Sequence, residues 1–363
     1  NGIPFLQIIL NQYAKYPFEN IYILAGYRGN TIFKKFNGRV LNFTKVNCII
    51  ERKLLGTAGS LRALKNRINN NFLLVNGDSF IDLKLNDIFF KKILRHKVFL
   101  TNSNIYKSNK KLSNLSLTSK KKIKFKKRGN LMNAGVYLFK KSIFSYIKNN
   151  SFSLEDEILP KLIDQNKIDG DYTNNYFIDI GTKKNLIYAR KTLLKYLYRP
   201  AAFLDRDGVI NYDTGYVHNF KEFKFRPGVI EGLKLLIKKK YYIFIITNQA
   251  GIGKGIFSIN EFYKLHNDIK EKLQKKDIYF DDINYCPFHP NAKLKKYRKV
   301  TELRKPGNLM IRQIKKKWHI KHNKSFMIGD KISDKICANK SKLYFEFAEK
   351  NFYNQIKRIT KKN

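Results

Sequence analysis

The sequence of 363 residues contains little cysteine, few acidic side chains and no long apolar stretch. Its three cysteines, Cys48, Cys286 and Cys337, lie far apart and lack the spacing of a disulfide framework, which suits a reducing cytoplasm. No apolar run approaches the roughly 20 residues that a membrane span needs, and no signal peptide is visible. We therefore expect a cytoplasmic protein that has no membrane partner.

Acidic residues are scarce beside basic ones: 28 Asp and Glu stand against 73 Lys and Arg, a formal net charge of +45. Such a field attracts anionic ligands, and it suggests nucleic-acid binding as one hypothesis. The lysines are spread along the whole chain, however, and no nucleic-acid-binding motif is recognised. The densest basic run, Lys120 to Arg128, predicts a solvated strand or hairpin with Ile123 and Phe125 on one face. We expect small phosphorylated ligands and no specific nucleic acid.

Two carboxylates stand two positions apart in the segment Phe203 to Asn211, where an apolar run stops and Gly208 lets the chain turn. On a strand, residues i and i+2 point the same way. Asp205 and Asp207 can therefore face one crevice, one as nucleophile or metal ligand and the other as proton donor. The alternative is a solvated turn, since Asp and Gly are common turn residues.

Two further apolar runs of this half also end in polar segments that contain glycine. Tyr241 to Ile246 precedes Thr247 to Gly255, and Phe326 to Ile328 precedes Gly329 to Asp334. Apolar strands separated by helical stretches predict a parallel sheet buried on both faces, and such sheets bind ligands beyond the carboxyl ends of their strands. We expect the three segments to converge there.

Five blocks of this half, in this order, resemble the haloacid dehalogenase superfamily of aspartate-dependent phosphatases. Within it they look like the D-glycero-D-manno-heptose-1,7-bisphosphate phosphatases, with relatives among the histidinol phosphatases. The blocks are Asp205 to Asn211, Arg226-Pro227-Gly228-Val229, Thr247-Asn248-Gln249, Arg304-Lys305-Pro306-Gly307 and Gly329 to Asp334. Five ordered blocks make a strong signal, whereas any one of them alone would be weak.

The resemblance implies roles for the polar residues of these blocks. Asp205 would attack phosphorus and form an aspartyl phosphate, and Asp207 would act as general acid and then general base. Thr247, Asn248 and Lys305 would bind the phosphoryl oxygens.

A metal site is also implied by the resemblance. Asp205, Asp330 and the backbone carbonyl of Asp207 would hold Mg²⁺, and Asp334 would position Lys305 or the waters of the metal. Lys254 and Arg304 would bind the second phosphate or the hydroxyls of the substrate. The alternative is that both are solvated surface residues.

One part of the family pattern is absent. These phosphatases often carry a zinc loop with a Cys-x-His pair followed by a Cys-x-Cys pair. Here Phe288 stands at the His position, and Thr301 and Leu303 stand where the later cysteines would be. Cys286 and His289 supply at most two of the four ligands of a structural zinc site, so we predict no zinc.

The N-terminal half alternates apolar runs with amphipathic stretches, which predicts a second mostly parallel sheet flanked by helices. Its expected strands are Ile21 to Ala25, Cys48 to Ile50, Phe72 to Val75, Val98 to Thr101, Gly135 to Phe139 and Tyr176 to Ile180, and its expected helices include Phe5 to Tyr16 and Lys183 to Tyr196. The length suffices for two buried cores. We therefore predict an α/β protein of two domains, residues 1–197 and 198–363, with a short linker near Tyr198-Arg199-Pro200.

Three segments of this half could carry chemistry. The glycine-rich turn Leu55 to Ser60 opens a helix and could admit a base or phosphate. Asp78 ends one strand and Asp179 lies in another, so the two carboxylates could share Mg²⁺. Acids at strand ends near turns are an equally good account of either one alone.

In this order the segments resemble the sugar-phosphate nucleotidyltransferases, over roughly residues 1 to 190. The resemblance implies that Asp78 and Asp179 bind the metal and that Gly56 lines the base pocket. Gly135 and Glu155 would contact the sugar, although Glu155 is equally well explained as an acid favoured by a helix N-terminus.

The opening of that family, a glycine-rich loop with Gly-Thr-Arg and a later Lys-Pro pair, does not occur in this sequence. We interpret this as a truncated record and expect poor nucleotide transfer or none. The leading hypothesis is a heptose-bisphosphate phosphatase fused to a heptose-1-phosphate nucleotidyltransferase, guanylyl rather than adenylyl by resemblance, acting on sugar phosphates and nucleotides. The alternatives are a histidinol-phosphate or nucleic-acid-end phosphatase with a non-catalytic N-terminal domain.

Overall fold

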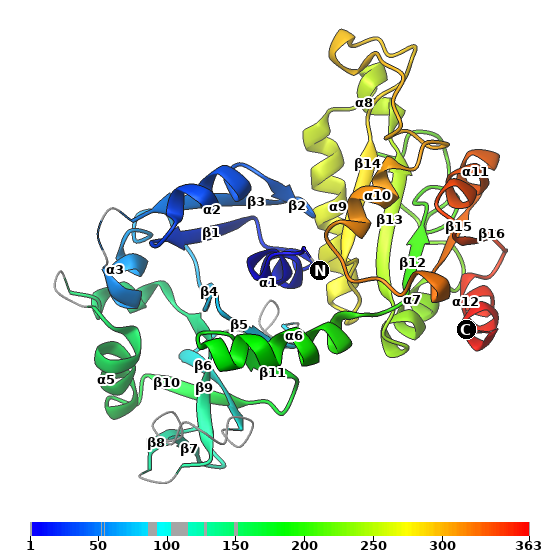
Figure 1. Cartoon of the computed structure of the whole chain (residues 1–363). Coiled ribbons are helices and arrows are strands. Elements are labelled where there is room, and N and C mark those ends of the chain that lie inside the picture. The colour runs from blue at the N-terminus through cyan, green and yellow to red at the C-terminus, as the bar shows by residue number, and fades with distance from the viewer. Residues whose placement is uncertain are drawn as a thin grey trace. The chain divides into compact units, whose positions relative to one another are not determined.

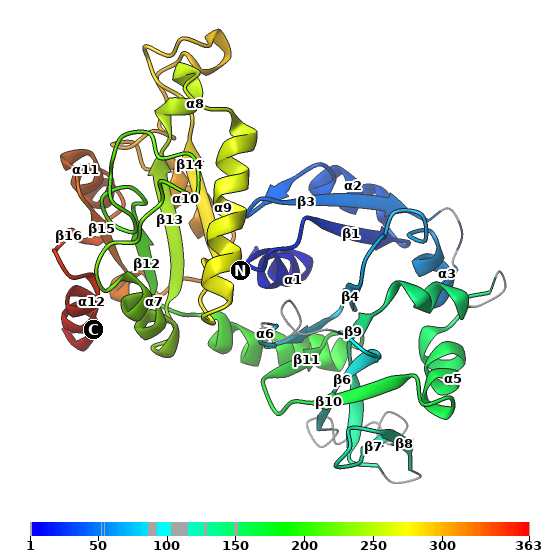
Figure 2. The same cartoon turned by 180° about the vertical axis from the view of Figure 1, so that it is seen from behind.

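The computed structural model describes residues 2–51, 53, 55–85, 93–102, 115–126, 129–148 and 152–362. The chain forms two compact units, seen in Figures 1 and 2 and described separately here. The first unit comprises Asn1–Ile21, Val40–Lys45 and Thr192–Asn363, and the second comprises Tyr22–Arg39 and Val46–Lys191. The expected α/β class is confirmed. Three segments of the expected N-terminal domain, residues 1–21, 40–45 and 192–197, thus group with the C-terminal residues, and the single boundary near residue 198 stays a prediction.

The first unit contains a five-stranded sheet in the order β14-β13-β12-β15-β16, and each neighbouring pair is parallel. The expectation of a parallel sheet is therefore confirmed here. Its strands are β12 (Ala201–Leu204), β13 (Tyr242–Asn248), β14 (Asp282–Cys286), β15 (Phe326–Gly329) and β16 (Tyr344–Phe347). The helices of this unit are α1 (Phe5–Ala14), α7 (Val229–Lys238), α8 (Ala250–Lys254), α9 (Ile259–Gln274), α10 (Leu309–Lys315), α11 (Ile332–Lys340) and α12 (Phe352–Lys362), with 3₁₀ turns η4 (Lys295–Tyr297) and η5 (His322–Lys324).

Both faces of this sheet are buried, because alternate residues of a strand enter opposite cores. Ala202 and Leu204 of β12 pack into the cluster that α7, α9 and α12 complete, and Phe203 packs into the one that α10 and α11 complete. Apolar side chains on both faces leave the polar residues for the ends of the strands. The sheet therefore presents its chemistry at its carboxyl edge.

The second unit contains a six-stranded sheet in which β10, β6, β9, β7 and β8 are neighbours and β4 also pairs with β9. These strands are β4 (Phe72–Val75), β6 (His96–Asn102), β7 (Leu115–Leu117), β8 (Ile123–Phe125), β9 (Leu131–Phe139) and β10 (Ile168–Tyr172). Outside this sheet, β5 pairs with β11, and β1, β3 and β2 form a sheet in that order. The segment Val40–Lys45, which holds β2 and the start of β3, belongs to the first unit. The remaining elements of this half are β1 (Asn20–Ala25), β2 (Val40–Leu41), β3 (Thr44–Ile50), β5 (Ser79–Ile81), β11 (Phe177–Asp179), α2 (Gly29–Phe36), α3 (Gly56–Arg62), α5 (Leu159–Asp164), α6 (Lys183–Leu197), the 3₁₀ turn η2 (Lys141–Ser145) and the π turn η3 (Leu154–Ile158).

The strand directions of the six-stranded sheet correct one expectation. Among its described strands, only β6 and β10 pair in parallel, and the pairs of β9 with β4, β6 and β7 and of β7 with β8 are antiparallel. Consecutive strands such as β7 and β8 are joined by short connections, which only antiparallel pairing allows. The sheet is therefore mixed rather than mostly parallel.

The densest basic run forms a strand where the sequence predicts one. Ile123 of β8 is buried and Phe125 is exposed, while residues 127 and 128 of the run lie outside the described residues. Within the described part of the chain, no helix combines the length and the apolarity that a membrane crossing requires.

Candidate active site

The candidate site of the first unit lies where β12, β13 and β15 end. Asp205 follows β12, and its Oδ2 lies 2.8 Å from Nζ of Lys305. The same Nζ lies 2.6 Å from Oδ1 of Asp334. The two carboxylates thus share one cation, and all three side chains are almost wholly buried. The structure brings Asp205 and Lys305 together although a hundred residues separate them in sequence.

Burial sets the electrostatics of this trio. It raises the pKa of Asp205 to about 7, against the opposing charge of Lys305. Burial also disfavours the charged Lys305 amine, but the neighbouring Asp205 and Asp334 outweigh this cost and raise its pKa. One ammonium facing two carboxylates leaves an excess of negative charge, which favours a further cation.

Asp330 follows β15 and supplies the third carboxylate. Oxygens of Asp205, Asp330 and Asp334 lie within 4.8 Å of one another. Within the described chain, Oδ1 of Asp330 is buried and has no hydrogen-bond partner, and burial raises the pKa of this carboxyl. Gly208 has φ +81°, and a Cβ there would stand 2.4 Å from Oδ2 of Asp330. Clustered carboxylate oxygens with an unused acceptor fit a hard divalent cation such as Mg²⁺.

Asp207 is held by three side chains. Its Oδ1 accepts hydrogen bonds from Nε of Arg206 at 3.0 Å and Nδ2 of Asn211 at 2.9 Å, and its Oδ2 accepts one from Nε2 of Gln249 at 2.9 Å. Arg206 is only 2% exposed and also donates to the carbonyl of Val217. Arg206 was not among the predicted site residues, although a cation between two acids in the motif was a signal for a role. These bonds fix the orientation of the Asp207 carboxylate.

The end of β13 joins the site through main-chain and amide contacts. Nδ2 of Asn248 donates to the carbonyl of Lys305, and the Lys305 amide donates to Oδ1 of Asn248, each at 3.0 Å. Oγ1 of Thr247 accepts a hydrogen bond from Gln249 at 2.9 Å. Asn248 therefore fastens the loop that carries Lys305, and its contact with a phosphoryl group stays a prediction.

Of the two further predicted cations, one lies at the end of a helix and the other on a loop. Lys254 ends α8 and donates from Nζ to the Tyr216 hydroxyl at 2.7 Å. Arg304 donates to the carbonyl of Phe288 at 3.5 Å. Their contacts with the substrate stay predictions.

Aromatic contacts hold the loop that contains Cys286 and Phe288, where the sequence predicts no zinc. Nζ of Lys299 lies 4.0 Å from the ring centroid of Phe288, whose ring also packs against Tyr297 at 5.8 Å. Sγ of the buried Cys286 lies 3.7 Å from the Phe288 carbonyl. A cation over an aromatic face thus stabilises the loop, and the absence of zinc stays a prediction.

The second unit brings its own predicted carboxylates together. Ser79 pairs with Asp179 between β5 and β11, and its hydroxyl lies 3.3 Å from Oδ1 of Asp78 and 3.2 Å from Oδ2 of Asp179. A Cβ on Gly181 would stand 3.3 Å from an oxygen of each acid. Burial, followed by the charge of Asp179, raises the pKa of Asp78.

The two glycines predicted to line the second site have backbones that favour glycine. Gly56 has φ +67°, and a Cβ there would stand 2.1 Å from the Phe152 carbonyl. Gly135 has φ +68°, with Asn76 2.8 Å from the position of a Cβ. At both positions the bare backbone lies against another segment of the chain, which accounts for the glycine there. The roles of Gly56 and Gly135 in substrate binding stay predictions.

Glu155 is tied to the same region by two residues that the sequence analysis did not assign. It accepts hydrogen bonds from Oγ1 of Thr57 at 2.8 Å and from the Tyr137 hydroxyl at 3.0 Å. Its charge also contributes to raising the pKa of Asp78, so the predicted sugar and metal residues share one electrostatic environment. Thr57 and Tyr137 belong to the same two motifs as Gly56 and Gly135.

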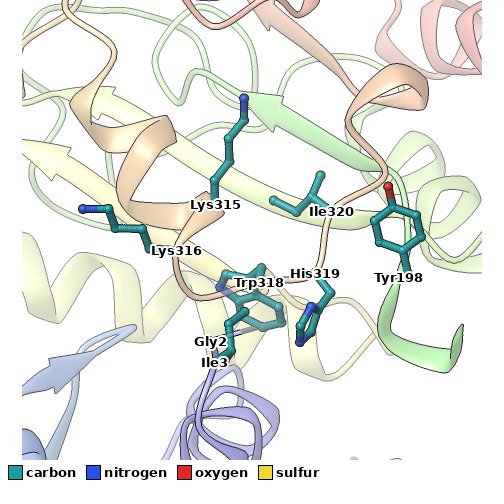
Figure 3. Close-up of a pocket in the computed structure, with 8 residues that line it drawn as sticks. All are labelled: Gly2, Ile3, Tyr198, Lys315, Lys316, Trp318, His319 and Ile320. Atoms are coloured by element: carbon teal, nitrogen blue, oxygen red, sulfur yellow. The ribbon is translucent and has the colours of Figure 1, made fainter. Parts of the chain in front are cut away.

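A separate pocket of about 550 Å³ lies in the first unit. It is lined by Gly2, Ile3, Tyr198, Lys315, Lys316, Trp318, His319 and Ile320, none of them a predicted site residue. Figure 3 shows that the amines of Lys315 and Lys316 point in different directions. The cations do not converge on one anion, so we place the candidate chemistry at Asp205 and not here.

Comparison with known proteins gives several matches. Residues 202–358 match the family described as polynucleotide kinase 3 phosphatase. The chain is 43% identical over 136 residues to the D-glycero-beta-D-manno-heptose-1,7-bisphosphate 7-phosphatase of Rhodopseudomonas palustris, a match that covers 38% of this chain and 76% of the relative. The corresponding enzyme of Photorhabdus laumondii is 42% identical over 144 residues, covering 40% of this chain and 77% of the relative.

One solved structure, HddC from Yersinia pseudotuberculosis complexed with GMP-PN, is also similar. It is 22% identical with a TM-score of 0.44, and the match covers 52% of this chain and 85% of that one.

Proposed function

Because the chain belongs to the family of D-glycero-β-D-manno-heptose-1,7-bisphosphate 7-phosphatases, we propose that its first unit removes the 7-phosphate from a D-glycero-D-manno-heptose 1,7-bisphosphate. The observation that carries the proposal is the buried Asp205–Lys305–Asp334 trio beside Asp330 at the carboxyl edge of a parallel sheet. Parallel sheets bind ligands at this edge. A cytoplasmic location is part of the proposal.

The chemistry follows from the order of these groups. A carboxylate oxygen of Asp205 attacks phosphorus while the bond from phosphorus to the sugar oxygen breaks, and Asp207 gives its proton to that oxygen. Asp207 then takes a proton from water, which attacks the aspartyl phosphate and releases phosphate and Asp205. Lys305, with Thr247 and Asn248, binds the phosphoryl oxygens and stabilises the charge that grows on them.

We propose that Asp205, Asp330 and the backbone carbonyl of Asp207 hold Mg²⁺. When bound, the ion supplies positive charge that screens the phosphoryl oxygens from the surrounding carboxylates. Asp334 pairs with Lys305 in the structure, and we assign it the role of positioning that amine. Arg304 and Lys254 remain our candidates for binding the 1-phosphate or the hydroxyls of the heptose.

Phosphate release from the heptose bisphosphate tests the proposal, with and without a metal chelator. We expect metal-dependent release, and ³¹P NMR should show that the 1-phosphate remains on the product. Histidinol phosphate and a 3′-phosphorylated oligonucleotide serve as competing substrates. Preferred turnover of either of these would overturn the substrate assignment.

A nucleic-acid-end phosphatase is the second candidate, favoured by the net charge of +45 and by the family match over residues 202–358. It predicts binding to DNA that weakens steeply with salt, because phosphate contacts release counterions. A heptose phosphatase does not need such binding. Salt titration of oligonucleotide binding therefore separates the two candidates.

For the second unit we propose a sugar-phosphate nucleotidyltransferase fold, within an N-terminal domain of residues 1–197, in which Asp78 and Asp179 hold Mg²⁺ and Gly56 lines the base pocket. Gly135 and Glu155 would contact the sugar. Incubation of the chain with GTP, heptose 1-phosphate and Mg²⁺ tests this proposal: formation of a GDP-heptose would support the transferase assignment, and a chain that binds neither GTP nor heptose 1-phosphate would contradict it.

A further inference from the structure

A strained two-residue turn joins β2 to β3 in the first unit. Asn42 has φ +46° and Phe43 has φ +69°. Tight hairpins use positive φ at both central positions, and Asn followed by Gly suits them. A bulky residue with this backbone is a genuine outlier, so its side chain must gain contacts that offset the strain.

Phe43 gains those contacts from four rings of α9 and β14. Its ring centroid lies 5.0 Å from His266, 5.1 Å from Tyr263, 5.7 Å from Phe262 and 6.4 Å from Tyr285. Aromatic pairs at such separations are attractive beyond the area that they bury. The ring of Phe43 is therefore an integral member of this aromatic cluster.

Hydrogen bonds fasten the main chain of the turn in place. Nζ of Lys270, a side chain only 3% exposed, donates to the carbonyls of Asn42 at 2.8 Å and Ala14 at 3.0 Å. Nδ2 of Asn42 donates to the carbonyl of Phe280 at 3.1 Å. The turn is thus fixed against α9 and cannot shift without leaving a buried amine unsatisfied.

On its other side the cluster touches the residue that orients Asp207. The guanidinium carbon of Arg206 lies 5.9 Å from the ring centroid of Phe262, and Phe262 packs against His266 at 4.2 Å. In the described chain, Nη1 of Arg206 has no hydrogen-bond partner. The guanidinium lies over the Phe262 ring, so the packing of Phe262 contributes to its position beside the hydrogen bonds to Asp207 and Val217.

We propose that Phe43 is a positioning residue for the phosphatase reaction. It holds Phe262 under Arg206, and Arg206 holds the carboxylate of Asp207 toward the leaving oxygen. The inference rests on the proposed function, in which Asp207 protonates that oxygen. It implies that a turn remote in sequence from the phosphatase motifs controls the efficiency of proton donation.

The leaving group provides the test. A sugar oxygen must be protonated as it departs, whereas p-nitrophenolate departs without a proton, so a misplaced Asp207 affects the first substrate more. For Phe43→Ala in the full chain, we expect kcat/KM for the heptose bisphosphate to fall about tenfold more than kcat/KM for p-nitrophenyl phosphate. This tenfold loss is smaller than the whole rate gain from general acid catalysis, because Asp207 is displaced and not removed. Val40→Ala, which trims an exposed side chain of the same hairpin, should change neither value.

Phe43→Gly separates the ring from the fold, because glycine relaxes the strained backbone while removing the same contacts. It should show the same selective loss, and Phe43→Tyr should restore most of it. An equal fall for both substrates, or no fall in a folded Phe43→Gly variant, would overturn the inference while leaving the proposed function intact. Failure of the wild-type chain to hydrolyse the bisphosphate would instead overturn the proposed function.

Discussion

The two units both bring distant carboxylates together at strand ends, but they balance the charge differently. In the first unit, the amine of Lys305 lies within 2.8 Å of Asp205 and 2.6 Å of Asp334. In the second unit, Asp78 and Asp179 share the hydroxyl of Ser79, and the charge of Asp179 raises the pKa of Asp78. In these contacts a charged amine lies between the acids of the first site, and a neutral hydroxyl lies between the acids of the second. Two pairs of acids at strand ends can therefore leave different amounts of negative charge for a bound cation.

Replacing Lys305, the cation of the first site, should have the largest effect on stability and on phosphate release. In Lys305→Met, the carboxylates of Asp205 and Asp334 stay buried without a partner, which costs about 3–5 kcal/mol of unfolding free energy. Phosphate release should fall by about 10²–10³-fold because a donor to the phosphoryl oxygens is lost. Thermal melting and phosphate release measure the two effects.

Lys234→Met is the matched control, since Lys234 is exposed on α7. It should melt and turn over like the wild type. Unchanged melting and activity in Lys305→Met would show that the amine has no part in either stability or catalysis.

In the second unit, removing one of the two like charges should stabilise the fold, whereas removing the cation of the first unit destabilises it. Burial and Asp179 raise the pKa of Asp78 above its ordinary value of 3.8, so the ionised form costs stability as pH rises through the folded pKa. Asp78→Asn should therefore raise the melting temperature at neutral pH by a few degrees, with a gain that shrinks as the pH approaches 3.8.

Added Mg²⁺ sharpens this test of the second unit. It should raise the melting temperature of the wild type more than that of Asp78→Asn, because ligand binding stabilises the folded state. A lower melting temperature for Asp78→Asn at neutral pH would contradict the repulsion that we infer between the two carboxylates.

The smallest expected effect concerns His96 of β6. The pKa of His96 is lowered from 6.5 to about 4, first by burial and then by the charge of Lys140. Between these values the unfolded chain binds more protons than the folded one, so stability is lost as pH falls from 6.5 toward 4. His96→Asn keeps an acceptor for the Lys140 amide, which bonds to Nδ1 at 3.2 Å. Urea titrations at several pH values across this range should show that the unfolding free energy of the variant depends less on pH than that of the wild type. An equal dependence on pH in both proteins would contradict the assignment.

The sequence predicts the parallel sheet of the first unit well, because its strands are continuous apolar runs that end in polar segments. The runs at Tyr241 and Phe326 correspond to β13 and β15, and Asp205, Lys305 and Asp330 come together as their motifs imply. The mixed sheet of the second unit was not predicted, since an apolar run carries no information about the direction of its neighbour.

Residues whose roles depend on tertiary contacts could not be predicted from the sequence either. Arg206 is 2% exposed, although arginine is ordinarily a surface residue, and its burial depends on Asp207 and Phe262. Phe43 stands in a turn where composition suggests no special role. Its neighbours come from α9 and β14, more than two hundred positions away, and local patterns do not record such contacts.

Phosphate release by Asp205→Asn tests the central claim, that the first unit is a phosphatase with Asp205 as its nucleophile, most directly. Asp277→Asn is the matched control, because Asp277 is exposed and its φ of +60° is one that asparagine tolerates. From the heptose 1,7-bisphosphate, we predict wild-type release for Asp277→Asn and a fall of more than about 10³-fold for Asp205→Asn. Turnover of folded Asp205→Asn at the wild-type rate would contradict the account.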